Sequence, residues 1–416
     1  MYSALVIVFG KGFWYNCAMK RRFYDEIVTQ SLLNFRQMVF LSGPRQVGKT
    51  TIAKAHANHY LNWDKDSVRQ LILSGQENVG VFCELERVHA DMPVIAFDEI
   101  HKYSRWKQFL KGFFDDYEDY CRIIATGSAK MDIYKRGGDS MMGRYFHYRV
   151  HPLSVAELLT TKLPDEQMVR SPAKLDDDEW AALCDFGGFP EPFIKRSKMF
   201  SSRWNRLRRE QLLKSDIRDL TRVSEIDQLG VLAEILANRS GEQIVYKALG
   251  NEVKIDEKTA KSWTAALKHL FYGFEIRPWY KNVENSIRKT PKWFLRDWAL
   301  VVDEGKRFET MVACHLLKAA EGWTDLGLGE FELFYIRDKQ KHEVDFLMTR
   351  DHEPWMLVEA KQGERKLSEN LIRFAEKLKV RHAFQVVKDL PYEDVDLFKC
   401  DHPVIAPART LLSQLL

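Results

Sequence analysis

Short apolar runs alternate with helical stretches from residue 21 up to residue 150. The runs are continuous, which is the pattern of strands buried on both faces of a sheet. Strands that alternate with helices in this way predict a parallel α/β sheet covered by helices on both faces. The expected strands are 38–41, 60–64, 93–99, 122–126 and 145–150, and the expected helices are 21–35, 51–57, 67–74 and 106–117.

From about residue 152 the pattern becomes mainly helical, and a loop rich in Gly and Pro at 187–192 interrupts it. Three more helices then precede two extended segments. This order, three helices followed by a hairpin, is typical of a winged helix. The helices are expected at 227–238, 242–250 and 256–270, and the extended segments at 274–280 and 293–295.

The last block returns to a mixture of strands and helices. A helix precedes three strands, and a second helix and a fourth strand complete the block. The helices are expected at 307–321 and 368–379, and the strands at 331–337, 343–348, 355–359 and 382–387.

Composition indicates a folded globular chain. A chain of 416 residues is too long to fold around one compact core, so two or three domains are expected. The 63 basic and 59 acidic residues give a net charge of +4, which is too balanced to indicate nucleic-acid binding by itself. The six cysteines include no C-x-x-C pair, which argues against a zinc knuckle and favours a reducing cytoplasm.

The first eighteen residues differ from the rest of the pattern. Residues 4–9 are apolar, but no basic residue precedes them, so a secretory signal is not expected. No apolar run is long enough to span a bilayer, and we expect no membrane partner. We interpret Met19 as the natural start and residues 1–18 as an N-terminal extension.

Residues 43–50 carry the most specific motif, because they fit G-x-x-x-x-G-K-[ST] between an expected strand and an expected helix. The glycines let backbone N–H groups approach phosphates, and the helix N-terminus favours an anion. Lys49 is expected to reach the β- and γ-phosphates, and Thr50 to ligate Mg²⁺. The residues expected to contact a nucleoside triphosphate are Gly43, Pro44, Arg45, Gln46, Val47, Gly48, Lys49, Thr50 and Thr51.

Two adjacent acids end the strand at 93–99. Asp98 is expected to hold Mg²⁺ through water, and Glu99 to polarise the attacking water. Acids on a buried strand are costly unless they are used. Thr126 and Ser128 end the next strand, where a hydroxyl can orient water or contact the γ-phosphate, although hydroxyls are common at strand ends without such a role.

Arg144 is the best candidate for an arginine that stabilises transferred charge, either in its own site or in the neighbouring site of a homo-oligomer. A structural ion pair is the alternative interpretation, and the sequence supports both equally.

The C-terminal block has a cluster of its own. Asp345 lies on one expected strand and Glu359 ends the next, with Lys361 two residues further on the same face. Such a set can hold Mg²⁺ and direct a hydroxide at a phosphodiester, with Glu309 as a third acid. The alternative is an exposed strand face with a Glu–Lys pair.

Basic residues gather in two places that could meet DNA phosphates. The region 195–222 holds ten basic and three acidic residues. Lys258, Lys261 and Lys268 lie on the third helix of the expected winged helix, although they could equally form a solvated face.

With these motifs placed, the chain from Met19 onward resembles a bacterial and archaeal family of AAA-type P-loop ATPases. Members of that family carry a C-terminal domain of unknown function that is similar to PD-(D/E)XK nucleases. The matching stretches are GPRQVGKTT, VIAFDEIHK, ATGSAK, GRYFHYRVHPLSVAEL, GGFPEP, KTPKWFLRD, HEVDFL and VEAKQ.

The resemblance implies roles for the residues that match these motifs. Lys49 and Thr50 would be Walker A residues, Asp98 and Glu99 Walker B residues, and Ser128 would take the sensor-1 position.

The nuclease-like triad falls on Asp345, Glu359 and Lys361, with Val344 where the family pattern has proline. The implied fold is an α/β P-loop sheet, a helical and winged-helix middle and a restriction-endonuclease-like α/β domain. The expected divisions are 1–18, 19–157, 158–285 and 286–416.

These observations predict a cytoplasmic, Mg²⁺-dependent ATPase that hydrolyses ATP to ADP and phosphate and acts as a switch. One alternative is an ATP-regulated DNA-processing enzyme with a metal-dependent nuclease-like domain. The other is a protein-interaction module controlled by nucleotide binding.

Overall fold

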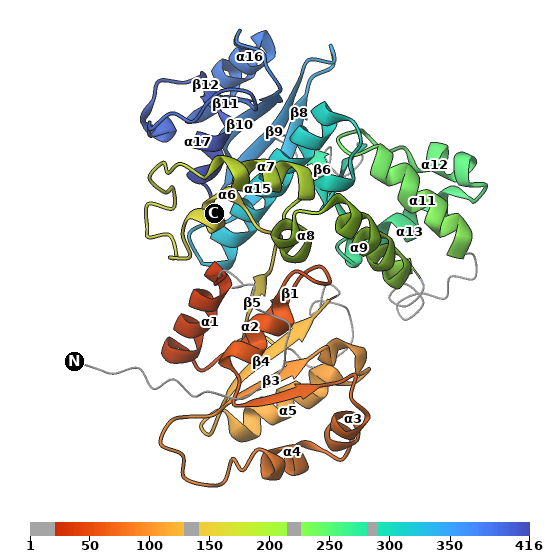
Figure 1. The fold of residues 1–416 in the computed structure, drawn as a ribbon, viewed down its shortest axis with the longest axis vertical. Helices are drawn as coiled ribbons and strands as arrows, with labels where there is room; N and C mark the ends of the chain where they lie inside the picture. The colour runs from red at the N-terminus through yellow and green to blue at the C-terminus, as the bar shows by residue number, and fades with distance from the viewer. Residues whose placement is uncertain (1–20, 129–140, 214–225, 281–289) are drawn as a thin grey trace.

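The computed structural model describes residues 21–128, 141–213, 226–280 and 290–416. The expected N-terminal extension, residues 1–18, lies outside these ranges, as does part of the basic region 195–222. A five-stranded sheet occupies one end of the molecule and a seven-stranded sheet the other, with a group of helices beside the second sheet (Figure 1).

All five strands of the N-terminal sheet are parallel, in the order β2-β3-β4-β1-β5. The parallel sheet expected from the continuous apolar runs is therefore confirmed, and all five strands end at the same edge. The strands are β1 (Met38–Ser42), β2 (His59–Asn62), β3 (Val94–Asp98), β4 (Arg122–Gly127) and β5 (Tyr145–Arg149).

Helices cover both faces of this sheet because alternate residues of each strand point to opposite sides. In β1, Val39 and Leu41 pack with α1 and α2, whereas Met38 and Phe40 pack with the helices of the other face. The helices are α1 (Phe23–Asn34), α2 (Lys49–His56), α3 (Asp66–Leu73), α4 (Gln76–Phe82) and α5 (Trp106–Tyr117), and the short η1 (Ile100–Lys102) follows β3.

The middle of the chain is helical, as expected. Three of its helices precede the antiparallel pair β6–β7, and Gln243 forms an additional antiparallel bridge to Lys292 of β7. The elements are α6 (Val155–Leu159), α7 (Asp177–Phe186), α8 (Pro190–Lys195), α9 (Lys198–Gln211), α11 (Ile226–Asn238), α12 (Tyr246–Val253), α13 (Glu257–His269), β6 (Gly273–Pro278), β7 (Lys292–Leu295) and η3 (Trp298–Leu300).

The C-terminal sheet is mixed, in the order β12-β11-β10-β9-β8-β6-β7, so it includes both strands of the preceding hairpin. Its two faces pack against α15 and α16. The remaining elements are α15 (Glu304–Asp325), β8 (Phe331–Arg337), β9 (Glu343–Arg350), β10 (Glu353–Lys361), α16 (Glu369–Leu378), β11 (His382–Val387), η4 (Leu397–Lys399), β12 (Val404–Pro407) and α17 (Ala408–Ser413).

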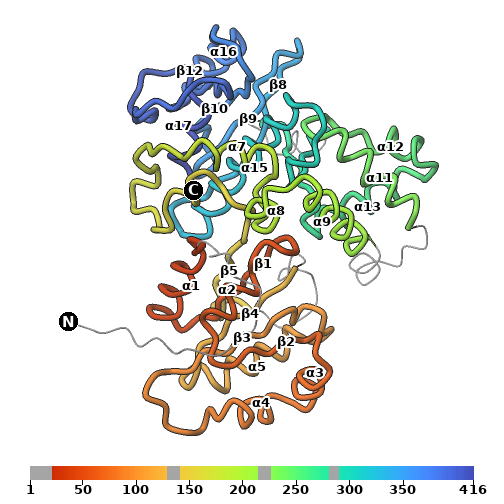
Figure 2. The backbone as a smooth tube through the Cα atoms, viewed as in Figure 1, coloured from red at the N-terminus to blue at the C-terminus, as the bar shows by residue number. Residues whose placement is uncertain are grey.

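One hydrophobic core joins the two sheets. It runs from α1 and α2 through α7 and α8 into α15 and the C-terminal strands. The last residue of the chain, Leu416, is buried in this core, and its carbonyl oxygen accepts a hydrogen bond from Ser154 Oγ at 2.8 Å. Figure 2 shows the C-terminus at this inner position. Among the described helices, none is both long and apolar enough to cross a bilayer.

Candidate nucleotide-binding site

The sheet order brings the predicted motifs together. β4 lies between β1 and β3, and parallel strands end at one edge. The loop 43–50 after β1, Ser128 after β4 and the acids at the end of β3 are therefore neighbours. Ligands of open α/β sheets bind at this edge, beyond the carboxyl ends of the strands.

Two glycines shape the loop between β1 and α2. Gly43 has φ +152°, and a Cβ atom there would lie 2.3 Å from the carbonyl oxygen of Val150. Gly48 has φ +107° and is the N-cap residue of α2. Side-chain-bearing residues are strained in this backbone region, so only glycine fits both places.

Lys49 points back into the loop. Its side chain is buried, and Nζ donates hydrogen bonds to the carbonyl oxygens of Gly43 at 2.9 Å and Pro44 at 2.8 Å. The loop therefore curls around a positive charge at the N-terminus of α2, which is the arrangement that binds phosphate.

Asp98 is the centre of a hydrogen-bond network. Both of its carboxylate oxygens lie 3.2 Å from Thr50 Oγ1, and it also accepts hydrogen bonds from Tyr60 Oη, Thr126 Oγ1 and, at 3.3 Å, Asn62 Nδ2. The adjacent hydroxyl and carboxylate oxygens of Thr50 and Asp98 are the type of donor that Mg²⁺ prefers. These residues fit the predicted metal ion.

Glu99 takes a left-handed backbone conformation, with φ +56°. Its Oε2 atom accepts a hydrogen bond from Ser128 Oγ at 3.1 Å and lies 3.4 Å from Lys102 Nζ. Burial acts to raise the pKa of Glu99, but the electrostatic interactions with His101, Lys49 and Lys102 outweigh it and lower the pKa. Glu99 is therefore an ionised acceptor at neutral pH.

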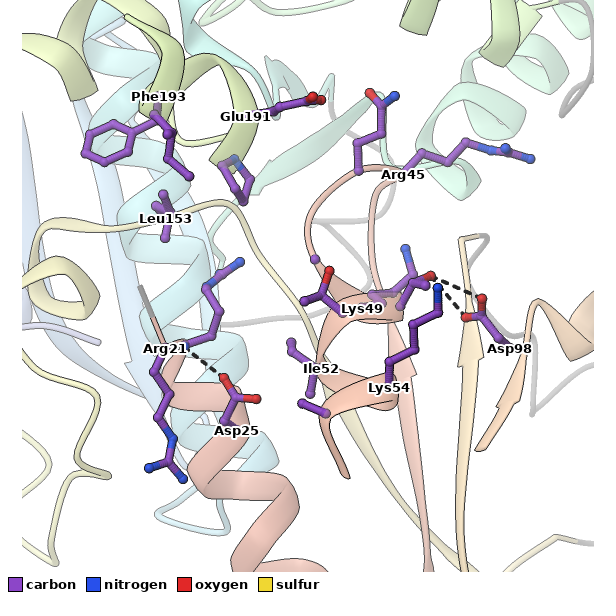
Figure 3. A pocket seen from close by; sticks show the side chains of 18 of the residues that line it. Arg21, Asp25, Arg45, Lys49, Ile52, Lys54, Asp98, Leu153, Glu191 and Phe193 are labelled. Carbon is purple, nitrogen blue, oxygen red and sulfur yellow. Dashed lines mark hydrogen bonds between the residues drawn. The ribbon is translucent and has the colours of Figure 1, made fainter. Parts of the chain in front are cut away.

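A cavity of about 1300 Å³ opens over these residues. The loop and α2 line it on one side, and residues of α8, including Glu191 and Phe193, line it on the other (Figure 3). The middle region of the chain therefore contributes a wall to the site, and the cavity is large enough for a nucleotide.

Arg22 supports the loop from behind and was not predicted. Its guanidinium is buried, with Nη1 donating to the Val47 carbonyl oxygen and Nη2 to the His151 carbonyl oxygen, both at 2.7 Å. Glu157 accepts from Arg22 and also from Lys318 Nζ of α15. Burial acts to raise the pKa of Glu157, but Arg22 and Lys318 outweigh it and lower the pKa to about 2.

Tyr60 and Asn62 were also missed. They are two residues apart at the end of β2, which pairs with β3, so both side chains point to the same face of the sheet as Asp98. Two polar residues at alternate positions of a short strand were the only sign in the sequence that this face of β2 meets a polar site.

Arg144 lies away from this site. It precedes β5, and its carbonyl oxygen accepts a hydrogen bond from the first residue of β1, Met38, at the opposite edge of the sheet from the loop. Its guanidinium pairs with Asp115 of α5, with Nε at 2.6 Å from Oδ1. The structural ion pair, which was one of the two interpretations of Arg144 from the sequence, is therefore observed. A role of Arg144 in the nucleotide site of a neighbouring subunit stays a prediction.

The four residues of the predicted C-terminal site do gather at one end of the C-terminal sheet. The ladder of β9 and β10 ends at the pair Phe346–Val358, so Asp345 and Glu359 are the next residues of the two strands. Lys361 Nζ lies 3.0 Å from Glu359 Oε1. The ammonium of Lys292 bridges Asp345 and Glu309 and was not predicted.

The basic residues proposed to meet DNA divide into two groups. Arg208 of α9 is buried against Asp297, and Lys268 pairs with Glu275 of β6. Lys258 and Lys261 of α13 are exposed. DNA binding stays a prediction.

Three family models match successive parts of the chain. Residues 35–159 match "AAA domain", residues 177–304 match "Domain of unknown function (DUF8612)" and residues 304–400 match "Domain of unknown function (DUF4143)". The resemblance to AAA-type ATPases followed by a domain of unknown function is therefore confirmed. None of the three descriptions mentions a nuclease, and that part of the resemblance stays a prediction.

Three similar proteins align with most of the chain, and each is named as uncharacterized. An uncharacterized protein of Methanocaldococcus jannaschii is 21% identical, with 91% of this chain and 87% of the relative aligned. Uncharacterized proteins of Mycobacterium tuberculosis and Mycobacterium bovis are 22% identical over 76% of this chain and 69% of each relative.

Similar solved structures share only a distant likeness. AMPPCP-bound DnaA from Aquifex aeolicus is 13% identical with a TM-score of 0.28, covering 58% of this chain and 85% of its own. Cdc6p from Pyrobaculum aerophilum is 12% identical with a TM-score of 0.25, covering 73% of this chain and 97% of its own. Scores this low carry no argument about function.

Proposed function

We propose that this chain, in which residues 35–159 are an AAA-type P-loop domain, is a Mg²⁺-dependent ATPase that hydrolyses ATP to ADP and phosphate. The observation that carries the proposal is that two sets of residues with complementary chemistry lie next to each other. One set, Lys49 and Thr50, suits phosphate and metal binding. The other set, the Glu99–Ser128 pair, suits the activation of water.

In this proposal Lys49 neutralises charge on the β- and γ-phosphates, and the backbone N–H groups of the loop hold the same oxygens. Thr50 and Asp98 would hold Mg²⁺, which would supply further positive charge to the phosphates. Glu99 accepts a hydrogen bond from a water molecule, and Ser128 fixes the orientation of that carboxylate. The water oxygen bonds to the γ-phosphorus while the bond from that phosphorus to the β–γ bridging oxygen breaks, which releases ADP. The proton that the water loses passes to Glu99 and then to the phosphate product.

We further propose that hydrolysis operates a switch. Two contacts support this idea. The cavity is bounded by the P-loop and by α8, so a nucleotide there would touch both parts of the chain. The loop is also tied through Arg22 and Glu157 to Lys318 of α15. Loss of the γ-phosphate would change contacts that reach beyond the N-terminal sheet.

The test is nucleotide binding and phosphate release by the full chain and by Lys49→Ala. We expect Lys49→Ala to lose both, because it removes the ammonium group that the loop carbonyls of Gly43 and Pro44 hold and that would neutralise the phosphates. Lys258→Ala is the matched control, since it removes an exposed lysine of α13 outside the cavity. Equal phosphate release by wild type and Lys49→Ala would refute the proposal.

A further inference from the structure

A buried lysine lies inside the acidic cluster of the C-terminal sheet. Lys292 is the first residue of β7, and its side chain is 6% exposed. Its Nζ atom lies 2.7 Å from Glu343 Oε1, 3.4 Å from Glu309 Oε1 and 3.7 Å from Asp345 Oδ1. Three carboxylates from α15 and β9 therefore surround one ammonium group.

We propose that the ammonium of Lys292 is the resident cation of this cluster and keeps a divalent metal ion out of it. An ammonium carries three N–H donors, and here it faces three carboxylates. Mg²⁺ would need the same oxygens at about 2.0–2.1 Å. Two cations cannot share that space, because their repulsion at such a separation in a buried site is large. The cluster as it stands does not fit a metal ion.

Lys292 is held in place by its surroundings. Its backbone pairs with Ile276 of β6 on one side and bridges to Gln243 on the other. Its ammonium lies 5.5 Å from the centre of the Tyr335 ring, which adds a cation–π contact. The backbone of Lys292 is therefore held on both sides, so its side chain begins from a fixed position beside the acids.

The other predicted ligands are also engaged within the chain. Asp345 Oδ2 accepts the backbone N–H of Ala360 at 3.0 Å, and Glu359 Oε1 pairs with Lys361. Glu359 Oε2 is buried without a hydrogen-bond partner, but one oxygen does not make a metal site. In the parts of the chain that the structure describes, no three His, Cys, Asp or Glu side chains are arranged to hold a metal ion.

The consequence is a cluster that joins elements and does not cut phosphodiesters. Lys292 links the β6–β7 hairpin to α15 and β9 through ion pairs that are mostly shielded from water. Removing its charge would leave the three acids facing one another. A divalent cation would then be attracted to the place that the ammonium had filled.

The test is to measure Mn²⁺ binding to the nucleotide-free full chain by electron paramagnetic resonance. We expect wild type to have no Mn²⁺ site that depends on Asp345. Lys292→Met should gain one, with affinity at least about tenfold higher than wild type because a full charge is removed at contact distance. Lys292→Arg keeps a cation and should gain none. Lys366→Met is the matched control, because the Lys366 side chain is 88% exposed and pairs with Glu369, outside the acidic cluster.

Two results would overturn the proposal. One is a Mn²⁺ site in wild type that Asp345→Asn removes. The other is a folded Lys292→Met, checked by circular dichroism, that binds no more Mn²⁺ than wild type. If Lys292→Met does not fold, the comparison of Mn²⁺ binding by wild type and Asp345→Asn still tests the proposal. Equal Mn²⁺ binding by these two proteins supports it, because the cluster then binds no metal ion in wild type.

Discussion

At the scale of single residues, Asp98 ends β3 and Glu99 follows it, and the two acids have different surroundings because the backbone changes between them. Adjacent residues of a strand point to opposite faces. Glu99 leaves the extended conformation, with φ +56°, and so both it and Asp98 line the same cavity. Asp98 is surrounded by hydroxyl and amide donors, whereas Glu99 contacts Ser128 and lies near Lys102.

The first prediction follows from this division. Glu99→Gln should lower the rate of phosphate release by about 10²–10⁴-fold, the usual contribution of a general base, while nucleotide binding is retained. Single-turnover phosphate release and binding of a fluorescent ATP analogue measure the two effects separately. Ser128→Ala should have a smaller effect in the same direction. A loss of binding in Glu99→Gln would show that Glu99 holds the nucleotide and does not activate water.

The residues of the loop and of the β3 end could be predicted because their spacing is local. Lys49 and Thr50 follow the glycines directly, and Asp98 and Glu99 end an apolar run. Arg22 and Tyr60 were not predicted, because their partners depend on which segments become neighbours. Arg22 reaches Val47 only because α1 packs behind α2, and Tyr60 reaches Asp98 only because β2 pairs with β3.

At the scale of elements, the P-loop is supported by the segment that precedes α1. The guanidinium of Arg22 donates to one loop carbonyl and pairs with Glu157 of α6. Buried charges of this kind are costly to leave without a partner. The conformation of the loop therefore depends on contacts that lie outside the phosphate-binding motif.

Arg22→Ala should lower the free energy of unfolding by about 1–3 kcal/mol, because the buried carbonyl oxygens of Val47 and His151 lose their donor while Glu157 keeps Lys318 as a partner. Nucleotide affinity should fall as well, since the Val47 carbonyl loses its donor. Denaturant unfolding and nucleotide titration measure these effects. Arg87→Ala is the control, because the Arg87 side chain is 72% exposed and lies outside the cavity. Equal stability of the two variants would contradict a supporting role for Arg22.

Elements were predictable where the apolar runs were long and continuous, as in β1, β3 and β4. The end of the chain was not predicted as structure. β12 is short and ends in Pro407, and it pairs only with β11. α17 is also short, and its apolar residues are buried only because the core of the C-terminal sheet lies next to it. Such segments depend on tertiary packing more than on their own pattern.

At the scale of the whole molecule, the border between the two domains of unknown function falls inside one folded unit. The two family matches meet at residue 304, where α15 begins. β6, from the part before this border, pairs in parallel with β8, from the part after it. The sheet is therefore shared by both matched regions.

A fragment that begins at residue 304 should aggregate or remain unfolded. It would expose the edge of β8 and the buried side of α15 to water. A chain that begins at Met19 keeps every described element and should stay as soluble as the full chain. Size-exclusion chromatography and circular dichroism of the two fragments test this. A monodisperse, folded 304–416 fragment would mean that the shared sheet is not required for folding.

α15 also has a mechanical consequence. At about 1.5 Å per residue its 22 residues form a rod of about 33 Å. Near its C-terminal end, Asp325 and Glu321 pair with Arg149 of β5, and near its N-terminal end Glu309 contacts Lys292. If the proposed ATP hydrolysis rotates β5, α15 would rotate with it as one rigid helix. Such coupling is reciprocal. If a bound nucleotide changes the affinity of a partner for the N-terminal end of α15 by some factor, that partner must change the affinity for the nucleotide by the same factor.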